Sequence, residues 1–324
     1  MLIIGAQGVL GGLMVSAFGD AGWAVRSAAR RARPGQVRVD LDQRDSIEAA
    51  VREDELIVNT VPHPDRLAER HVLEHGGTLI NVSAAPAAAG RSLRAVAGAA
   101  RGTVVMNAGL APGVTTIIAA DLLRLHPDAD GLEIVYTLSS TTPRGRASAD
   151  FIHRGLTTVA RHRTAVVRLE EPFGERVCVG FDEGDAGWLG GIAEGRIVRQ
   201  YVCLAERAVH ERLLELNVAG RVNELPRSLI GPRRPLTDAR GNDEPVAHWI
   251  AAISAGRRLG ARSVICRGDF LHAARSTVVL AGALRTQARA CGCFDAEEIW
   301  TLSSVEAGLR AAGIKILARS CRAT

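Results

Sequence analysis

The sequence lacks an apolar stretch long enough to cross a bilayer, which takes roughly 18 to 20 residues. Its longest candidate, residues 108–123, is interrupted by Pro112 and Asp121. No basic segment precedes the first apolar residues, so no signal peptide is predicted. We therefore expect a cytoplasmic protein with no membrane partner.

Lysine and aromatic residues are scarce. Lys315 is the only lysine, so the formal net charge of +5 comes from arginine, and aromatic residues make up 4% of the chain. Arginine pairs such as Arg30-Arg31 and Arg257-Arg258 are dispersed and have no recognition motif around them. We therefore expect no nucleic-acid partner.

Cysteine pairs with metal-ligand spacing are also missing. The six cysteines include no Cys-x-x-Cys, and Cys291-Gly-Cys293 is too tight for the usual zinc spacing. We predict reduced thiols and no metal site.

The first thirteen residues carry glycine at three-residue intervals, between an apolar run and an amphipathic pattern. Residues 2–4 predict a strand, and the spacing beyond Gly8 predicts a helix. Glycines so placed allow a tight turn, close approach to a phosphate and close packing of helix on strand. The free amides at the helix start would then face a pyrophosphate. The residues assigned to this contact are Gly5, Gln7, Gly8, Val9, Leu10 and Gly11.

Strands and helices alternate as far as residue 108. Apolar runs predict further strands at 23–28, 37–40, 55–61, 78–82 and 103–107. This alternation predicts an α/β fold, a Rossmann-type doubly wound parallel sheet. Ligands of such sheets bind beyond the carboxyl ends of the strands, so further cofactor contacts are expected there. The residues at these ends are Asp40, Leu41, Thr60, Val61, Ser83, Asn107 and Gly109.

The second predicted strand ends in arginines, at the place where a carboxylate would bind a free ribose 2′-hydroxyl. Residues 26–36 contain no acid. Guanidinium groups pair bidentately with phosphate oxygens, so Arg30 and Arg31 suit a 2′-phosphate. We therefore predict NADP(H) as the cofactor in preference to NAD; the alternative is an exposed basic loop.

The same glycine spacing occurs in short-chain dehydrogenases, which need a tyrosine followed four residues later by a lysine. Tyr136 is followed at that spacing by Ser140, and Tyr201 by Ala205. That chemistry is excluded, and any proton donor must be another group or water.

Residues 107–116 carry the turn Gly109-Leu-Ala-Pro112-Gly113, which opens an alanine-rich helix. This turn resembles the one after the sixth strand of the saccharopine dehydrogenase and reductase-like proteins. Other segments resemble that family too, at 59–62, 78–83, 268–290, 297–298 and 313–316. The resemblance implies an NAD(P)-dependent oxidoreductase with an inserted second domain, acting on a carbon–nitrogen bond next to carboxylates. Ala111 stands where members that make or split saccharopine usually have an acid.

The rest of the chain predicts a second, α+β domain. Strands are predicted at 132–139, 165–170, 176–180 and 196–204, without helices long enough for parallel crossovers. We expect a largely antiparallel sheet, with helices at 149–161, 210–218 and 246–258. The domains would then be 1–125 for the dinucleotide, 126–268 for substrate and dimerisation, and 269–324 as helices returning to the first domain.

Candidate chemistry in the second domain follows its first strand. Arg144 and Arg146 are able to hold a substrate carboxylate. Asp150 and His153 lie one turn apart on the predicted helix, and His153 is able to supply a proton because its ordinary pKa is near the working pH. The alternative is an exposed basic loop beside a surface pair of Asp150 and His153.

These features predict hydride transfer between NADP(H) and an imine or carbonyl carbon of a small, carboxylate-bearing substrate, in which the nicotinamide supplies the hydride chemistry. The alternative is a regulatory protein that binds NADP to sense redox state without turning it over. We also expect a homodimer.

Overall fold

The computed structural model of the chain describes residues 1–52, 54–139, 142, 144–181, 189–193, 195–230, 243–286 and 290–319. The chain divides into two compact units, each built on a seven-stranded sheet. The first contains Met1–Ile117, Trp188–Gly191 and Ala273–Ala312, and the second contains Ile118–Gly187, Ile192–His272 and Gly313–Thr324. None of the described helices combines the length and the apolar character that a membrane crossing requires.

The sheet of the first unit is parallel throughout, in the order β13-β6-β5-β4-β1-β2-β3. Its strands are β1 Leu2–Ile4, β2 Arg26–Ala29, β3 Val37–Arg38, β4 Leu56–Asn59, β5 Thr78–Asn81, β6 Thr103–Met106 and β13 Gly292–Asp295. The strand order reverses between β1 and β4, which is the switch point at which doubly wound sheets bind ligands. The predicted Rossmann-type sheet is confirmed, and β13 adds an edge strand that was not predicted.

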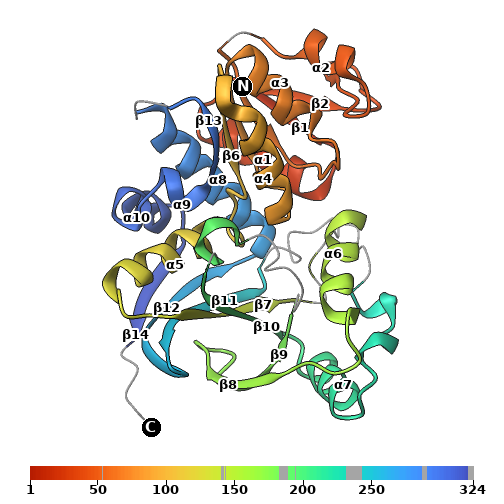
Figure 1. Cartoon of the computed structure of the whole chain (residues 1–324). Helices are drawn as coiled ribbons and strands as arrows, with labels where there is room; N and C mark the ends of the chain where they lie inside the picture. Colours follow the sequence, from red (N-terminus) through yellow and green to blue (C-terminus); the bar gives the residue numbers. More distant parts are fainter. Residues whose placement is uncertain are drawn as a thin grey trace. The chain divides into compact units, whose positions relative to one another are not determined.

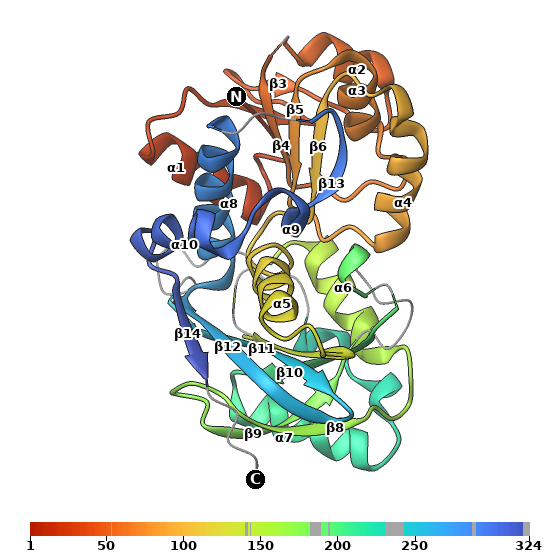
Figure 2. The same ribbon diagram turned by 60° about the vertical axis from the view of Figure 1, so that its left-hand side comes forward.

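Helices cover both faces of this sheet, as parallel strands buried on both sides require. Figure 2 shows α1 and α8 on one side of the strands and α2, α3 and α4 on the other. The helices are α1 Val9–Asp20, α2 Arg44–Ala50, α3 Leu67–His75, α4 Ala87–Val96, α8 Asp269–Arg285, α9 Ala296–Ile299 and α10 Leu302–Ala311, with a 3₁₀ turn η1 at Ala97–Ala99. Leu2, Ile57 and Leu79 are fully buried against Val72 and Leu73 of α3, so the core lies between the sheet and these helices.

The sheet of the second unit is largely antiparallel, as predicted, in the order β14-β12-β11-β7-β10-β9-β8 (Figure 1). Among its described strands, only β7 and β10 pair in parallel. The strands are β7 Gly131–Leu138, β8 Thr164–Arg168, β9 Glu175–Gly180, β10 Ile197–Leu204, β11 Pro245–Ser254, β12 Arg257–Arg267 and β14 Lys315–Arg319. The other helices of the chain are α5 Val114–Leu125, α6 Arg146–Thr157 and α7 Arg207–Val218, with 3₁₀ turns η2 Gly190–Ala193, η3 Val222–Glu224 and η4 Arg227–Leu229.

Residues 246–258 were predicted as a helix, and this prediction is wrong. They form β11 and the start of β12. The run is apolar at almost every position, so it has no period that distinguishes a strand from a helix. Ala255 and Gly256 have φ of 48° and 78° and make the two-residue turn of a hairpin. The apolar run therefore becomes an interior strand, paired with β7 on one side and β12 on the other.

Candidate functional site

The glycine turn after β1 is so tight that a side chain would collide at two of its three glycines. Gly5 has φ of +88°, and a Cβ there would lie 2.4 Å from Oγ1 of Thr60 and 2.5 Å from Cγ2 of Val61. A Cβ on Gly11 would lie 2.0 Å from the carbonyl oxygen of Gly5. At Gly8 the same oxygen would be 3.2 Å away, which is tight but not a collision. The backbone of α1 therefore packs directly on the end of β1, and the end of β4 closes over Gly5.

The start of α1 presents uncapped amides. Gly8 is the N-cap residue, and it has no side chain with which to accept from them. The first-turn amides, which include those of Val9 and Leu10, have no acceptor within the helix. No acidic side chain lies in this turn, so the positive end of the helix dipole is left unneutralised by α1 itself. Such a helix end is suited to a phosphate.

Gln7 connects the glycine turn to the loop after β2. Its Nε2 donates to the carbonyl oxygen of Arg31 and to Oε1 of Gln36, both at 2.7 Å. Oε1 of Gln36 also accepts from the Arg33 amide at 3.1 Å. Arg30 and Arg31 are exposed in this loop. The loop that carries both predicted phosphate-binding arginines is therefore anchored to the glycine turn.

A carboxylate and a histidine pair beyond the ends of β3 and β4. Oδ1 of Asp42 lies 2.9 Å from Nε2 of His63. This hydrogen bond, with the charges of His63 and Arg30, holds the pKa of Asp42 below its ordinary value. Of the two residues predicted here, Asp40 accepts from the Asp42 amide, and Leu41 has its side chain in the hydrophobic core. The cofactor contacts predicted for Asp40 and Leu41 remain predictions.

Three buried asparagines hold the turns that follow β4 and β5. They are Asn59, Asn81 and Asn107, and each side-chain oxygen accepts a main-chain amide at 3.0 Å or less. The donors are, in the same order, Val61, Ser83 and Ala85. These bonds fix the turns in which the predicted cofactor residues lie. Asn107 was predicted as a site residue, whereas Asn59 and Asn81 were not.

A buried carboxylate lies behind two of these asparagines. Oε1 of Glu69, on α3, accepts from the amide groups of Asn59 at 3.0 Å and Asn81 at 2.5 Å. Arg66 precedes α3 and is 7% exposed, with its guanidinium 3.5 Å from Oγ of Ser83. Its Nε has no hydrogen-bond partner among the described residues, and burial lowers its pKa although the charge of Glu69 opposes this. Neither residue was predicted, yet Arg66 places a desolvated cation beside Ser83.

The turn from Gly109 to Gly113 leads from β6 into α5. A Cβ on Gly113, which has φ of +125°, would lie 2.1 Å from the carbonyl oxygen of Gly109. The peptide between Ala111 and Pro112 is cis, and the Gly109 amide donates to the Pro112 carbonyl oxygen at 3.0 Å. Because this turn follows the carboxyl end of β6, it belongs to the same edge of the sheet as the glycine turn.

Glu297 follows the carboxyl end of β13, which runs parallel to β6, so it also lies at this edge. Burial and the charge of Asp295 raise the pKa of Glu297 to about 7, although a hydrogen bond with Thr116 opposes the rise. A carboxyl group with a pKa near 7 exchanges its proton readily at neutral pH, as general acids and bases do. The sequence carries no local signal for this, because the pKa depends on residues brought together by the fold.

The four residues predicted for chemistry in the second unit have different surroundings. Arg144 is buried and donates to the main-chain carbonyls of Ser139 and Thr142, whereas Arg146 is exposed at the start of α6. The carboxylate of Asp150 pairs with the guanidinium of Arg227, and Nε2 of His153 lies 3.1 Å from the carbonyl oxygen of Leu225. Asp150 and His153 thus each bond to the segment around η4.

A different polar group, not predicted, lies where β11 begins and β12 ends. Oε1 of Glu244 accepts from Oγ1 of Thr142 at 2.7 Å and from the Asp269 amide at 3.0 Å. Nδ1 of His248 accepts from the Thr137 amide at 3.2 Å, so its proton is on Nε2, 3.9 Å from Oδ1 of Asp269. Residues 246–258 were assigned to a helix, which would have separated these groups.

The fold defines a two-unit protein in which a Rossmann-type sheet with a tight glycine turn is combined with a mostly antiparallel α+β unit. Two solved structures share this fold over the whole chain. The first is saccharopine dehydrogenase (L-Glu forming) from Saccharomyces cerevisiae, with a TM-score of 0.57 at 11% identity, covering 98% of this chain and 99% of that one. The second is homospermidine synthase from Legionella pneumophila in complex with NAD, with a TM-score of 0.64 at 11% identity, covering 98% and 90%.

At 11% identity, these similarities show a shared fold. The predicted resemblance to saccharopine dehydrogenase-like proteins is therefore confirmed for the fold. Comparison of the sequence with protein-family models and with curated proteins finds no match.

Proposed function

We propose that this protein is an NADP(H)-dependent oxidoreductase that transfers hydride to or from an imine or carbonyl carbon of a small, carboxylate-bearing substrate. The observation that carries the proposal is the glycine turn, where Gly5 and Gly11 leave no room for side chains and the start of α1 has no side-chain cap. This geometry suits a pyrophosphate. The homospermidine synthase of the same fold was solved with NAD, which supports a nicotinamide dinucleotide.

Arg30 and Arg31 support NADP(H) over NAD(H), because exposed guanidinium groups beside the glycine turn suit a ribose 2′-phosphate. Replacing both by alanine is expected to weaken NADPH binding at least about tenfold, since a hydrogen bond to a charged group is worth roughly 1.5–3 kcal/mol. NADH binding should change little. Dissociation constants for both cofactors, from fluorescence or calorimetry, measure this, with Arg38→Ala as a control that removes another exposed arginine.

Equal losses of NADPH and NADH affinity in the double variant would contradict the 2′-phosphate contact. Failure of the wild-type protein to bind either cofactor would contradict the proposed function as a whole.

For the substrate, we propose that its carboxylate contacts Arg146, which is exposed at the start of α6, where the helix dipole also favours an anion. Arg144 is bonded to main-chain carbonyls, and its proposed part is to shape the loop that precedes Arg146. His153, oriented by the Leu225 carbonyl and beside Asp150 on the helix, is the proposed proton donor. Arg146→Ala should raise KM for a carboxylate substrate more than it lowers kcat.

Glu297 is the competing proton carrier, supported by its place at the carboxyl edge and its pKa of about 7. The pH dependence of kcat/KM distinguishes the two groups. If Glu297 carries the proton, Glu297→Gln removes a titration near pH 7, and His153→Gln leaves that titration in place. A titration near pH 7 that survives in Glu297→Gln would exclude Glu297 as the proton carrier.

Turnover separates the enzyme from the alternative, a regulatory protein that binds NADP without consuming it. We expect NADPH oxidation with some member of a panel of imines and 2-oxo acids, followed by absorbance of the reduced nicotinamide. Tight NADPH binding without turnover over the whole panel would favour the regulatory protein.

We further propose a homodimer formed through the second unit. Val166 of β8 and Val177 of β9 are register partners, and their exposed fractions are 56% and 40%. Contiguous exposed apolar surface can mark a protein–protein interface, and this pair is the observation that motivates the proposal. Light scattering should give twice the chain mass for the wild type, and Val166→Asp should shift the protein towards the monomer. A wild-type monomer at all concentrations would contradict this proposal.

A further inference from the structure

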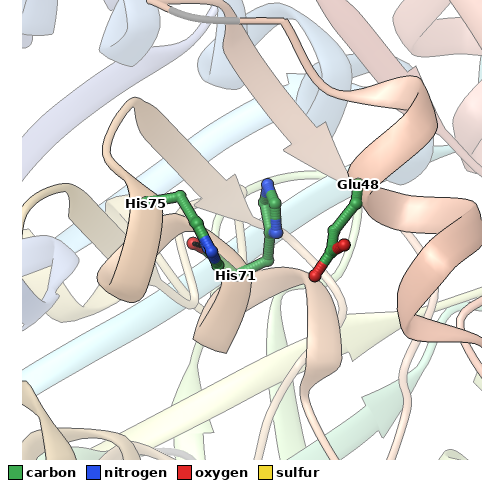
Figure 3. Close-up of side chains that lie close together, drawn as sticks. All are labelled: Glu48, His71 and His75. Carbon is green, nitrogen blue, oxygen red and sulfur yellow. Dashed lines mark hydrogen bonds between the residues drawn. The ribbon is translucent and has the colours of Figure 1, made fainter.

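Three side chains that could hold a metal ion, none of them among the residues discussed for the cofactor, lie on α2 and α3 of the first unit. His71 and His75 are one helical turn apart on α3, and Glu48 is on α2. One potential ligand atom from each residue lies within 4.8 Å of the other two. Figure 3 shows the ring of His71 standing between Glu48 and His75.

The ring of His75 is oriented by its own helix. Its Nδ1 lies 3.1 Å from the carbonyl oxygen of His71, and because a carbonyl only accepts, this nitrogen carries the proton. Nε2 of His75 therefore has a free lone pair. Metal-ligating histidines are oriented in this way, with one ring nitrogen donating to a carbonyl and the other binding the ion.

His71 supplies an independent observation. Its side chain is 7% exposed, and its Nδ1 is buried with no hydrogen-bond partner among the described residues. Leaving a buried polar atom unpartnered is unfavourable, so native structures rarely do so without a reason. A cation held by this ring and its two neighbours would provide that reason.

We propose that Glu48, His71 and His75 bind a divalent cation of the Zn²⁺ class and that the ion clamps α2 to α3. Two imidazoles and one carboxylate form a typical zinc donor set, with water in the fourth position. Bonds of about 2.0–2.1 Å place tetrahedral donors about 3.3 Å apart, so atoms that now lie up to 4.8 Å apart must approach by up to about 1.5 Å. Glu48 and His75 are exposed, which leaves their side chains free to make this movement.

The charged neighbours of the group are Arg44 and Glu74. Nε of Arg44 lies 3.6 Å from Oε1 of Glu48, in an exposed pair one turn apart on α2. Pairs of this kind contribute little to stability. Arg44 also pairs with the carboxylate of Glu74, so it keeps an acidic partner when Glu48 turns towards a cation.

The site revises the expectation of no metal, which rested on cysteine spacing alone. The sequence does contain a signal, His71-Val-Leu-Glu-His75, with histidines four residues apart on a helix. The third ligand comes from another helix, and only the fold brings it near.

The test uses full-length protein without a histidine tag, stripped with EDTA, dialysed and titrated with ZnCl₂ by calorimetry. His75→Ala and Glu48→Gln each remove an exposed ligand and keep the core intact. Glu211→Gln is the matched control, because Glu211 is an exposed helical glutamate that likewise pairs with an arginine four residues away, Arg207. Thermal unfolding and NADPH binding are measured on the same samples.

We expect one Zn²⁺ per chain in the wild type and in Glu211→Gln. Binding should be at least about 100-fold weaker in both ligand variants, since loss of even an outer partner of a metal ligand costs about 10–100-fold. Zinc at about 100 times its dissociation constant should raise the thermal midpoint of the wild type by about 5 °C. NADPH binding should be the same in the wild type and in the three variants. A failure of zinc binding can therefore be distinguished from a failure of the proposed function.

Wild-type protein that takes up no zinc at one ion per chain would overturn the proposal, as would ligand variants that bind zinc like the wild type. Substitution with Co²⁺ tests for one alternative, binding at the exposed thiol of Cys291. A thiolate-to-metal absorption band would place the ion there and also overturn the proposal; we expect the spectrum of a nitrogen and oxygen site.

Discussion

Glu297→Gln is expected to change the pH dependence of stability in a direction that follows from the raised pKa. In the unfolded chain this carboxyl has its ordinary pKa of 4.5, whereas in the folded protein it titrates at about 7. Between these values the native state holds a proton that the unfolded state has lost, so native stability falls as the pH rises through this window. At 1.36 kcal/mol per pH unit the full loss is about 3 kcal/mol, of which about 2.5 kcal/mol falls between pH 5 and pH 8.

Glutamine does not titrate, so the stability of the variant does not fall in this way as the pH rises. The free energy of unfolding of Glu297→Gln, minus that of the wild type, should therefore rise by about 2.5 kcal/mol between pH 5 and pH 8. Any effect of the substitution that does not depend on pH cancels in this comparison. Urea unfolding followed by tryptophan fluorescence provides the measurement, since Trp300 is buried just after α9.

Glu306→Gln serves as the control, because Glu306 is a partly exposed glutamate of α10 that pairs with Arg310. Its difference from the wild type should be the same at both pH values. A difference between Glu297→Gln and the wild type that is equally independent of pH would refute the argument that burial raises the pKa of Glu297.

Three further substitutions test the packing of the first unit. Gly11→Ala should destabilise this unit by more than about 2 kcal/mol and abolish NADPH binding, because the new Cβ would lie 2.0 Å from a carbonyl oxygen. At Gly12 there is room for a methyl group, since the nearest atom to a new Cβ would be 3.8 Å away. Gly12→Ala should instead stabilise α1 by about 0.5–1 kcal/mol, and similar urea midpoints for the two variants would contradict this reasoning. Glu69→Ala leaves the side-chain amides of Asn59 and Asn81 without their acceptor and should lower the free energy of unfolding by about 2–4 kcal/mol. A decrease of less than about 1 kcal/mol would show that these two hydrogen bonds contribute little to stability.

The parts of the fold that the sequence predicted are those with a local physical cause. A side chain would collide at Gly5 and Gly11 and would be crowded at Gly8, so the spacing of these glycines was enough to predict the turn, the strand before it and the helix after it. The strands of both sheets were predicted where turn residues separated them. The hairpin of β11 and β12 was missed because a strand buried on both faces has no alternation.

The candidate site was less predictable, because its decisive contacts are long-range. Arg30 and Arg31 could be proposed from their place after the second strand, in a segment without acids. Nothing local marks Glu69 as the acceptor of two asparagines on different strands, nor Glu297 as a carboxyl whose pKa is raised by burial. These environments depend on which helices and strands pack together, and the periodicity of a single sequence does not reveal such long-range contacts.

The charges along the carboxyl edge of the first unit are arranged asymmetrically, and this bears on what it binds. Two acids at this edge are engaged by neighbours, since Asp42 pairs with His63 and Glu69 accepts from asparagine amides. Arg30 and Arg31 are exposed there, and the dipole of α1 adds positive potential at the glycine turn. A ligand with three phosphates in place of two gains most from such an edge, so the preference for NADPH over NADH should weaken as salt screens these exposed charges. A preference that does not change with ionic strength would mean that shape, rather than charge, selects the cofactor.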